Sequence, residues 1–142
     1  MDQWNPDLTR DNQCAPTPRT PGYHVTEDLI DEAIGFIRDQ QAAAPGKPFF
    51  SYVAMGACHS PHQAPQRNID KYKGQFDCGW DETRRRWLER QRALGIIPEG
   101  TELTPLNPRV TPWDEMTPDQ QRLCARMQEV FAGFLDHTDE QI

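Results

Sequence analysis

Two histidines, His59 and His62, are the residues of this chain whose type and position best suit chemistry. They lie in a short loop that Pro61 and Pro65 stiffen, because proline fixes its own backbone φ angle. An imidazole ring can donate a hydrogen bond or a proton near neutral pH, which suits it to proton transfer with a reacting group. We therefore take residues 58–66 as the candidate site loop.

The loop follows an apolar run that predicts a buried strand over residues 48–57, interrupted only by Ser51 and Gly56. A continuous apolar run is typical of a strand covered on both faces, as in the parallel sheets of α/β proteins. In open α/β sheets, ligands bind just beyond the carboxyl ends of the strands. His59 and His62 follow the strand at that position.

Three helices are predicted around this strand, over residues 26–41, 81–94 and 117–141. Thr26 is a good N-cap for the first helix, and Thr117 with Gln120 forms the pattern of a capping box for the last. Residues 1–22 contain four prolines and few apolar residues, so we expect an extended loop there.

The predicted elements form an incomplete fold. One strand cannot make a sheet, and a buried strand needs hydrogen-bonding neighbours on both edges. The fold class expected is α/β, with one central buried strand, flanking helices and long loops. We expect residues 1–142 to be a single, partial domain of a larger α/β structure.

The charge balance is acidic: 15 Lys and Arg against 22 Asp and Glu give a net charge of −7. This argues against binding to nucleic acid or to an anionic membrane, since both require a basic face. No apolar stretch approaches the roughly 20 residues that span a bilayer. Residues 1–13 have no apolar core, so we expect no secretory signal there and assign neither a cytoplasmic nor a periplasmic location.

The segment PFFSYVAMGACHSPHQAP, together with NIDKYKGQFDCGWDETRRRWLERQRALGIIPEGTELTP, resembles the middle of bacterial arylsulfatases. These are formylglycine-dependent sulfatases of the alkaline-phosphatase-like superfamily. The resemblance extends from YHVTEDLIDEAIGFI to FLDHTDEQI, and a strand followed by His-x-Pro and Gln-Ala-Pro is its most specific part. It implies a partial sulfatase catalytic domain whose complete form hydrolyses small-molecule sulfate esters, with residues 58–66 as the active-site loop.

The resemblance also implies roles for individual residues. His59 stands where the family places a histidine that contacts the sulfate and the leaving-group oxygen, and His62 is a weaker candidate for substrate binding. Cys58 occupies a position that is usually proline, which affects loop rigidity or redox sensitivity. Calcium and formylglycine are implied for the complete enzyme, but no metal ligand is expected among the residues of this chain.

Cys14 imitates part of the family's C-x-P-x-R motif, whose cysteine matures to formylglycine. Pro18 stands where the motif has arginine, so we do not take Cys14 as the nucleophile. The isolated chain is therefore expected to be inactive and to need the remainder of the sulfatase domain for folding and activity.

Three alternatives remain open. The chain is a non-catalytic truncated remnant, or part of a phosphate mono- or diester hydrolase of the same superfamily, or a small zinc-binding module. The zinc site would use Cys58, His59, His62 and Cys78. It is the least favoured alternative, because the adjacent Cys58 and His59 could rarely both reach one tetrahedral ion. Outside the loop, we expect His24 to be structural and His137 to be exposed in an ion-pair network.

Overall fold

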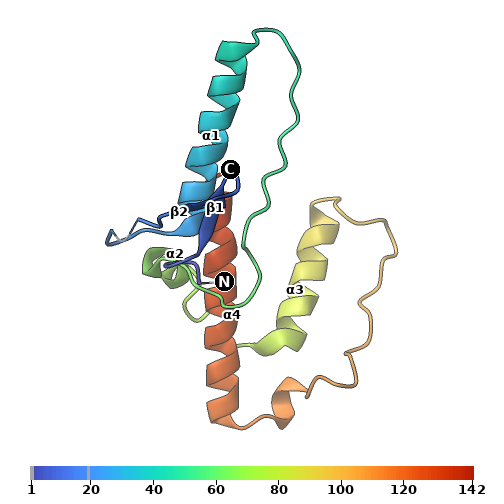
Figure 1. Cartoon of the computed structure of the whole chain (residues 1–142). Helices are drawn as coiled ribbons and strands as arrows, with labels where there is room; N and C mark the ends of the chain where they lie inside the picture. The colour runs from blue at the N-terminus through green and yellow to red at the C-terminus, as the bar shows by residue number, and fades with distance from the viewer. Residues whose placement is uncertain (1, 19) are drawn as a thin grey trace. The chain divides into compact units, whose positions relative to one another are not determined.

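The computed structural model describes residues 2–18 and 20–142 (Figure 1). Its elements are β1 (Leu8–Arg10), β2 (Gln13–Ala15), α1 (Val25–Ala43), α2 (Gln66–Asp70), α3 (Gly79–Ala93), the 3-10 helix η1 (Trp113–Glu115) and α4 (Pro118–Asp139). The chain divides into two compact units. Unit 1 contains Met1–Lys71 and Val130–Ile142, and unit 2 contains the intervening Tyr72–Glu129. The helix α4 contributes residues to both.

The strands β1 and β2 of unit 1 form an antiparallel hairpin, in which Leu8 pairs with Ala15. The two turn residues, Asp11 and Asn12, have φ angles of 50° and 64°. Two-residue hairpin turns favour this left-handed backbone, and Asp and Asn tolerate it better than most residues. The extended loop predicted for residues 1–22 is therefore wrong over the hairpin.

The helix α1 begins one residue earlier than predicted, and its N-cap is His24 instead of Thr26. The Nδ1 atom of His24 accepts a hydrogen bond from the backbone N–H of Thr26 at 3.2 Å. A side-chain acceptor at this position satisfies one of the N–H groups that have no partner within the helix. The helix continues to Ala43, beyond the predicted end at residue 41.

The buried strand predicted over residues 48–57 is wrong for this chain. The segment runs as an irregular extended trace from the end of α1 to α2 (Figure 1). Phe50 is 91% exposed and Tyr52 is 84% exposed. A strand needs a neighbour to pair with, and β1 and β2, the strands found in the described ranges, pair with each other. The described part of the chain is therefore mainly helical, with one small hairpin.

The core of unit 1 forms where α2 and the last turns of α4 meet. Ala64, Ile69 and Phe134 make up its buried centre, and Ala57 and Val130 pack against it. Phe134 is completely buried. Burying an aromatic side chain of this size stabilises a fold by about 1.5–3 kcal/mol. This core fixes the loop that carries His59 between the extended segment and α2.

Unit 2 is organised around the start of α3. Gly79 has a φ angle of 81°, and the ring of Trp113 fills the space where a Cβ atom would project. Trp113 also packs edge-to-face on Trp80, with 4.9 Å between ring centroids, and the backbone N–H of Trp113 donates to Asp81 Oδ2 at 3.3 Å. These contacts explain why α3 begins at Gly79, ahead of the predicted residue 81.

The capping box predicted for α4 is confirmed. The backbone N–H of Gln120 donates to Thr117 Oγ1 at 3.3 Å, and the N–H of Thr117 donates to Gln120 Oε1 at 2.9 Å. The helix ends at Asp139, two residues before the predicted end. In the part of the chain that the structure describes, no helix has the length and apolar character needed to cross a membrane.

Candidate active site

His59 lies exposed in the loop before α2. Its backbone N–H donates to the carbonyl of Gly56 at 2.8 Å, which closes a tight turn. Its Nδ1 atom lies 2.6 Å from the carbonyl oxygen of Ser60. A carbonyl can only accept, so Nδ1 carries the proton in this contact. The ring is thereby oriented, and Nε2 remains as the atom that can exchange a proton with a bound molecule.

A pocket of about 400 Å³ adjoins His59 in unit 1. Its lining residues come from the N-terminal segment, the hairpin, α1 and the extended segment: Gln3, Leu8, Val25, Leu29, Ala54, Met55, Gly56, His59 and Ser60. Most of this wall is apolar, and the polar side chains are those of Gln3, His59 and Ser60. An apolar pocket with a few polar groups is the usual form of a small-molecule site.

Gln3 is the pocket residue that sequence reasoning missed. Its backbone N–H donates to Gln63 Oε1 at 2.6 Å, and its carbonyl accepts from the N–H of Val25 at 2.9 Å. Its side chain is buried, yet Oε1 has no hydrogen-bond partner among the described residues. No local pattern marks Gln3, because its neighbours in the pocket are distant in sequence.

The structure does not bring His62 to the lining of this pocket. Its ring packs edge-to-face on Phe131 of α4, with 5.2 Å between centroids. Cys58 is half-buried beside His59, and burial raises the pKa of its thiol, which favours the protonated form. Cys14 is exposed on β2.

Neither of the metals considered from the sequence has a formed site in the described ranges. Within residues 2–18 and 20–142, no three His, Cys, Asp or Glu side chains converge as metal ligands. The zinc alternative therefore gains no support from the geometry. These residues also do not fit the calcium ion that the resemblance implies, and we assign no step through calcium to them.

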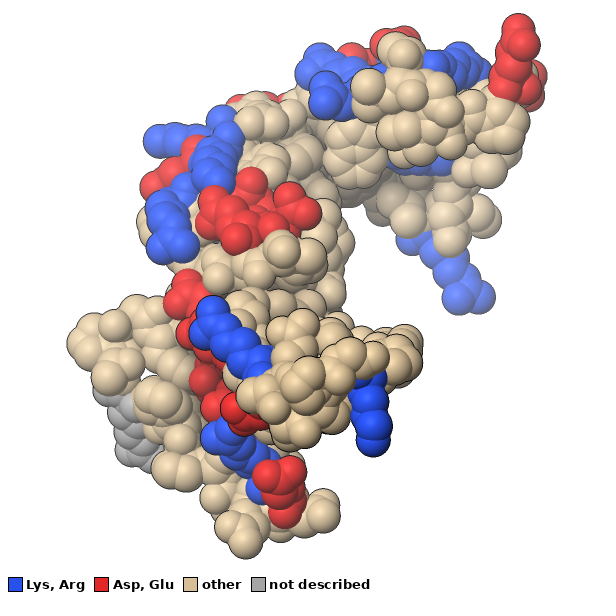
Figure 2. All heavy atoms as spheres, turned by 90° about the horizontal axis from the view of Figure 1, so that it is seen from above, with Lys and Arg blue, Asp and Glu red and all other residues tan. Residues whose placement is uncertain are grey.

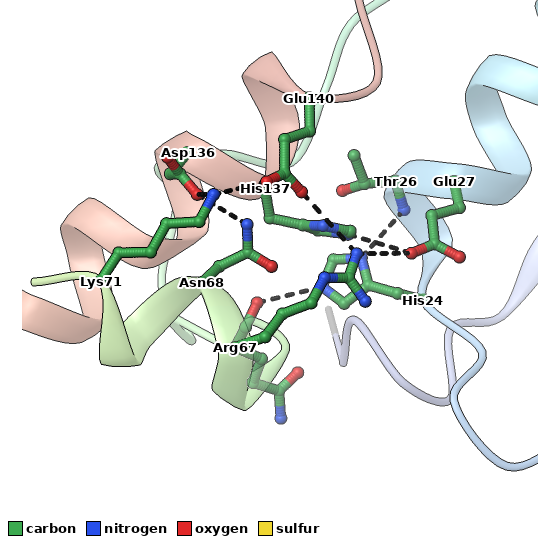
Figure 3. Close-up of polar contacts among 10 residues, drawn as sticks. His24, Thr26, Glu27, Arg67, Asn68, Lys71, Asp136, His137 and Glu140 are labelled. Carbon is green, nitrogen blue, oxygen red and sulfur yellow. Dashed lines mark hydrogen bonds and ion pairs between the residues drawn. The ribbon is translucent and has the colours of Figure 1, made fainter.

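A second polar group of residues, here called the histidine cluster, consists of His24, Glu27, Arg67, Asn68, Asp136 and His137 (Figure 3). His24 lies at the start of α1. Because its Nδ1 accepts from Thr26, its Nε2 carries the proton and donates to the carbonyl of Gln63 at 3.0 Å. Burial lowers the pKa of His24, so this neutral tautomer is the stable one.

His137 is completely buried, and the prediction that it is exposed is wrong. Its ring packs edge-to-face on His24 at 4.6 Å, and its Nε2 lies 3.6 Å from Glu27 Oε1. Burial, followed by repulsion from His24, lowers the pKa of His137 to about 4. The acidic neighbours Asp136 and Asp139 suggested an exposed face, but this part of α4 packs against the start of α1.

Ion pairs link members of the histidine cluster to Lys71 and Glu140 (Figure 3). Lys71 Nζ lies 2.7 Å from Asp136 Oδ2 and 2.5 Å from Glu140 Oε1. Arg67 pairs more loosely with Glu140, at 3.7 Å, and with Glu27, at 4.0 Å. The cluster contains no activated nucleophile, and its contacts join α1, α2 and α4. We therefore assign it a structural role.

Charged side chains of both signs are interspersed on the face shown in Figure 2. The basic run Arg84 to Arg86 belongs to α3, where Arg85 and Arg86 pair with Glu82. Arg84 donates to the carbonyl of Thr104 at 2.7 Å. These arginines are thus engaged in local contacts within unit 2.

Comparison with known proteins places these observations in a family context. The sulfatase family model matches residues 1–142. The chain is 36% identical over 134 residues to the arylsulfatase of Klebsiella aerogenes. The aligned region covers 94% of this chain and 28% of that protein. It is 37% identical over 120 residues to an uncharacterized sulfatase of Schizosaccharomyces pombe, covering 84% of this chain and 20% of that protein. The chain thus spans less than a third of the length of either relative.

Proposed function

Because the chain belongs to the sulfatase family, we propose that it is a segment of an enzyme that hydrolyses sulfate esters. In this proposal, His59 lies in the pocket that holds the sulfate and the leaving-group oxygen. The observation that carries it is the oriented ring of His59, with Nδ1 bonded to Ser60 and Nε2 remaining beside a largely apolar pocket.

The chemistry of the reaction explains why such a histidine is useful. Hydrolysis breaks the bond between sulfur and the ester oxygen, and that oxygen leaves with a negative charge unless it receives a proton. When His59 is protonated, Nε2 can donate that proton, while Nδ1 stays hydrogen-bonded to the Ser60 carbonyl. The apolar wall of the pocket suits the organic part of an aryl or similar sulfate ester.

We further propose that the 142-residue chain alone is inactive. It contains neither a complete C-x-P-x-R motif nor the Asp-Asn-Gly motif expected for calcium binding, and its Asp11-Asn12 pair forms the turn of the β1–β2 hairpin. The nucleophile and the metal ligands would then come from the remainder of the sulfatase domain. That remainder is the partner that the chain needs for activity.

The test begins with sequencing the DNA on both sides of this coding segment. An in-frame C-x-P-x-R motif upstream and an Asp-Asn-Gly motif downstream are expected. The longer protein encoded together with these flanking regions, here called the extended protein, should release nitrophenol from para-nitrophenyl sulfate. The 142-residue chain should not. Stop codons on both sides would instead favour a non-catalytic remnant. Hydrolysis of para-nitrophenyl phosphate alone would replace the sulfatase proposal by the phosphate-ester alternative.

Substitution of the two loop histidines in the extended protein then tests the site. We expect His59→Ala to lower kcat by about a hundredfold or more, as for loss of a proton-transfer group. His62→Ala is the matched control, because His62 packs on Phe131 and does not line the pocket. Equal losses for the two variants, with unchanged circular dichroism, would remove His59 from the proposed role.

A further inference from the structure

We propose that Gln3 determines substrate specificity in the His59 pocket, by accepting a hydrogen bond from a hydroxyl or N–H group on the organic part of the sulfate ester. This inference rests on the proposed function and adds a property of the substrate to it. The substrate would have an apolar body and at least one hydrogen-bond donor besides the sulfate ester.

The first observation is an unsatisfied acceptor at a built site. Gln3 is only 2% exposed, and its Oε1 atom has no hydrogen-bond partner in the described part of the chain. Folded proteins pair nearly all of their buried polar groups, because an unpaired one loses its hydration without replacement. Gln3 also lines the pocket, so a rotation of its carboxamide towards a ligand donor in the pocket would supply the missing partner.

The second observation is that the backbone of Gln3 is fixed on both sides. Its N–H bonds to the side chain of Gln63, and its carbonyl bonds to the N–H of Val25 at the start of α1. The carbonyl of Gln63 is in turn bonded by His24. A residue held in this way loses little conformational entropy when its side chain binds a ligand.

The third observation concerns Gly56, which precedes the site loop and also lines the pocket. A Cβ atom on Gly56 would lie 2.8 Å from Gln3 Oε1 and 3.2 Å from Gln3 Nε2. Glycine at this position therefore leaves room for the Gln3 carboxamide. The Gly56 carbonyl also accepts the N–H of His59, so this one turn contacts both Gln3 and His59.

The remaining wall defines the rest of the ligand. Leu8, Val25, Leu29 and Met55 present hydrocarbon to the pocket. Such a wall favours an aromatic or alicyclic body over a fully hydroxylated sugar, which would bury many polar groups without partners. One buried acceptor then distinguishes ligands by whether they place a donor near Gln3.

The experiment compares pairs of substrates with the extended protein. Each of the ortho-, meta- and para-hydroxyphenyl sulfates is paired with the phenyl sulfate that has a methyl group in place of the hydroxyl. The wild type should prefer at least one hydroxylated isomer in kcat/KM. We expect Gln3→Met, which keeps the side-chain length but removes the acceptor, to lower that preference by about tenfold, mainly through KM. The control Gln91→Met changes an exposed residue of α3 and should keep the preference.

Two further measurements separate the possible failures. Gln3→Glu retains acceptor oxygens and should keep or increase the preference, which a merely structural role would not produce. Direct calorimetric binding of catechol and of 2-methylphenol, each to wild type and Gln3→Met, tests the acceptor without catalysis. If wild type and Gln3→Met hydrolyse the substrates with the same preference for the hydroxylated isomer, the proposed role of Gln3 is overturned and the proposed function is not. An inactive wild type that still binds catechol through Gln3 would overturn the proposed function and leave the pocket inference standing.

Discussion

Gly133 of α4 packs directly against the backbone of Ile69 in α2. A Cβ atom on Gly133 would lie 2.7 Å from the Cα atom of Ile69 and 2.8 Å from its backbone nitrogen. Backbone atoms cannot move aside as the end of a flexible side chain can. The two helices can therefore share the core around Phe134 only because residue 133 has no side chain.

Replacing Gly133 by alanine is expected to destabilise unit 1. Alanine is the better helix former by about 0.5–1 kcal/mol, but overpacking a core typically costs about 1–3 kcal/mol. Gly35→Ala is the matched control, since Gly35 is also helical and has no atom within 4 Å of its Cβ position. We expect Gly35→Ala to stabilise α1 and Gly133→Ala to lower the thermal midpoint of the helical circular dichroism signal. Stabilisation by both substitutions would show that Gly133 does not pack closely against the backbone of Ile69.

The buried amide of Asn68 gives a second prediction. Its Nδ2 atom donates to Asp136 Oδ2 at 2.6 Å, and its side chain is fully buried. Asn68→Asp would replace this donor by a carboxylate facing another carboxylate. Because the new carboxylate would be buried and would face the partly exposed Asp136, we expect a loss of at least about 2 kcal/mol in unfolding free energy.

The chain contains a matched control for that change. Gln66 Nε2 donates to Asp70 Oδ1 at 2.6 Å, and both side chains are exposed. Gln66→Glu makes the same chemical change in water, where the expected cost is below about 0.5 kcal/mol. Denaturant titrations of the two variants measure the difference, and equal costs would show that burial of Asn68 has no energetic weight.

The stability of unit 1 is expected to fall as the pH falls from about 6.5 towards 4. The pKa of buried His137 is lowered to about 4, chiefly by burial, whereas an unfolded histidine has a pKa near 6.5. Between these values the unfolded chain takes up a proton that the folded chain does not. Stability is therefore lost on acidification, by up to about 1.4 kcal/mol per pH unit for one proton. His24, whose pKa is also lowered by burial, acts in the same direction.

The charged neighbours of His137 oppose one another and do not reverse this sign. His24 and Arg67 lower its pKa, while Glu140 and Asp136 raise it, and Glu27 lies within 3.6 Å. His137→Leu should make the helical signal less sensitive to pH between 6.5 and 4. Leu135→Ala, an exposed change on the same helix, should leave the sensitivity as it is. Increased stability of the wild type on acidification would refute the assignment.

The exposed apolar segment predicts self-association of the isolated chain. Phe50 and Tyr52 are almost fully exposed, and Phe49 and Val53, which flank them in the sequence, are also exposed. An extended apolar segment without a hydrogen-bonded neighbour can pair with a second copy of itself. We expect the double variant Phe50→Asp, Tyr52→Asp to reduce the oligomeric fraction in sedimentation velocity. Leu94→Asp, which changes an exposed leucine of unit 2, should not reduce it.

Elements determined by local sequence could be predicted, as the start of α4 illustrates. Thr117 and Gln120 satisfy each other within four residues, so the capping box was visible in the sequence. The position of His59 in a loop after an apolar segment was equally local. By contrast, the cap of α1 depends on His24, whose ring is held by Gln63, and the Gln3 backbone contact with Gln63 spans 60 residues.

The remaining errors also have physical causes. The apolar run over residues 48–57 has the composition of a buried strand, but pairing requires a neighbouring strand that composition cannot supply. His137 has acidic sequence neighbours, yet its burial depends on the packing of α4 against α1. The hairpin was the avoidable error, because Asp11-Asn12 is itself a turn signal that the nearby prolines obscured.

The division of α4 between the two units has a consequence for the integrity of the chain. Unit 1 is assembled from two stretches of sequence that unit 2 separates. A single backbone cut within unit 2 would break their covalent link but not the contacts of Gly133 with Ile69 or of Asp136 with Lys71. The molecule thus has the organisation of a split protein, in which residues 130–142 act as a helical peptide ligand for residues 1–71. Two separately produced fragments would be expected to reconstitute unit 1 by complementation.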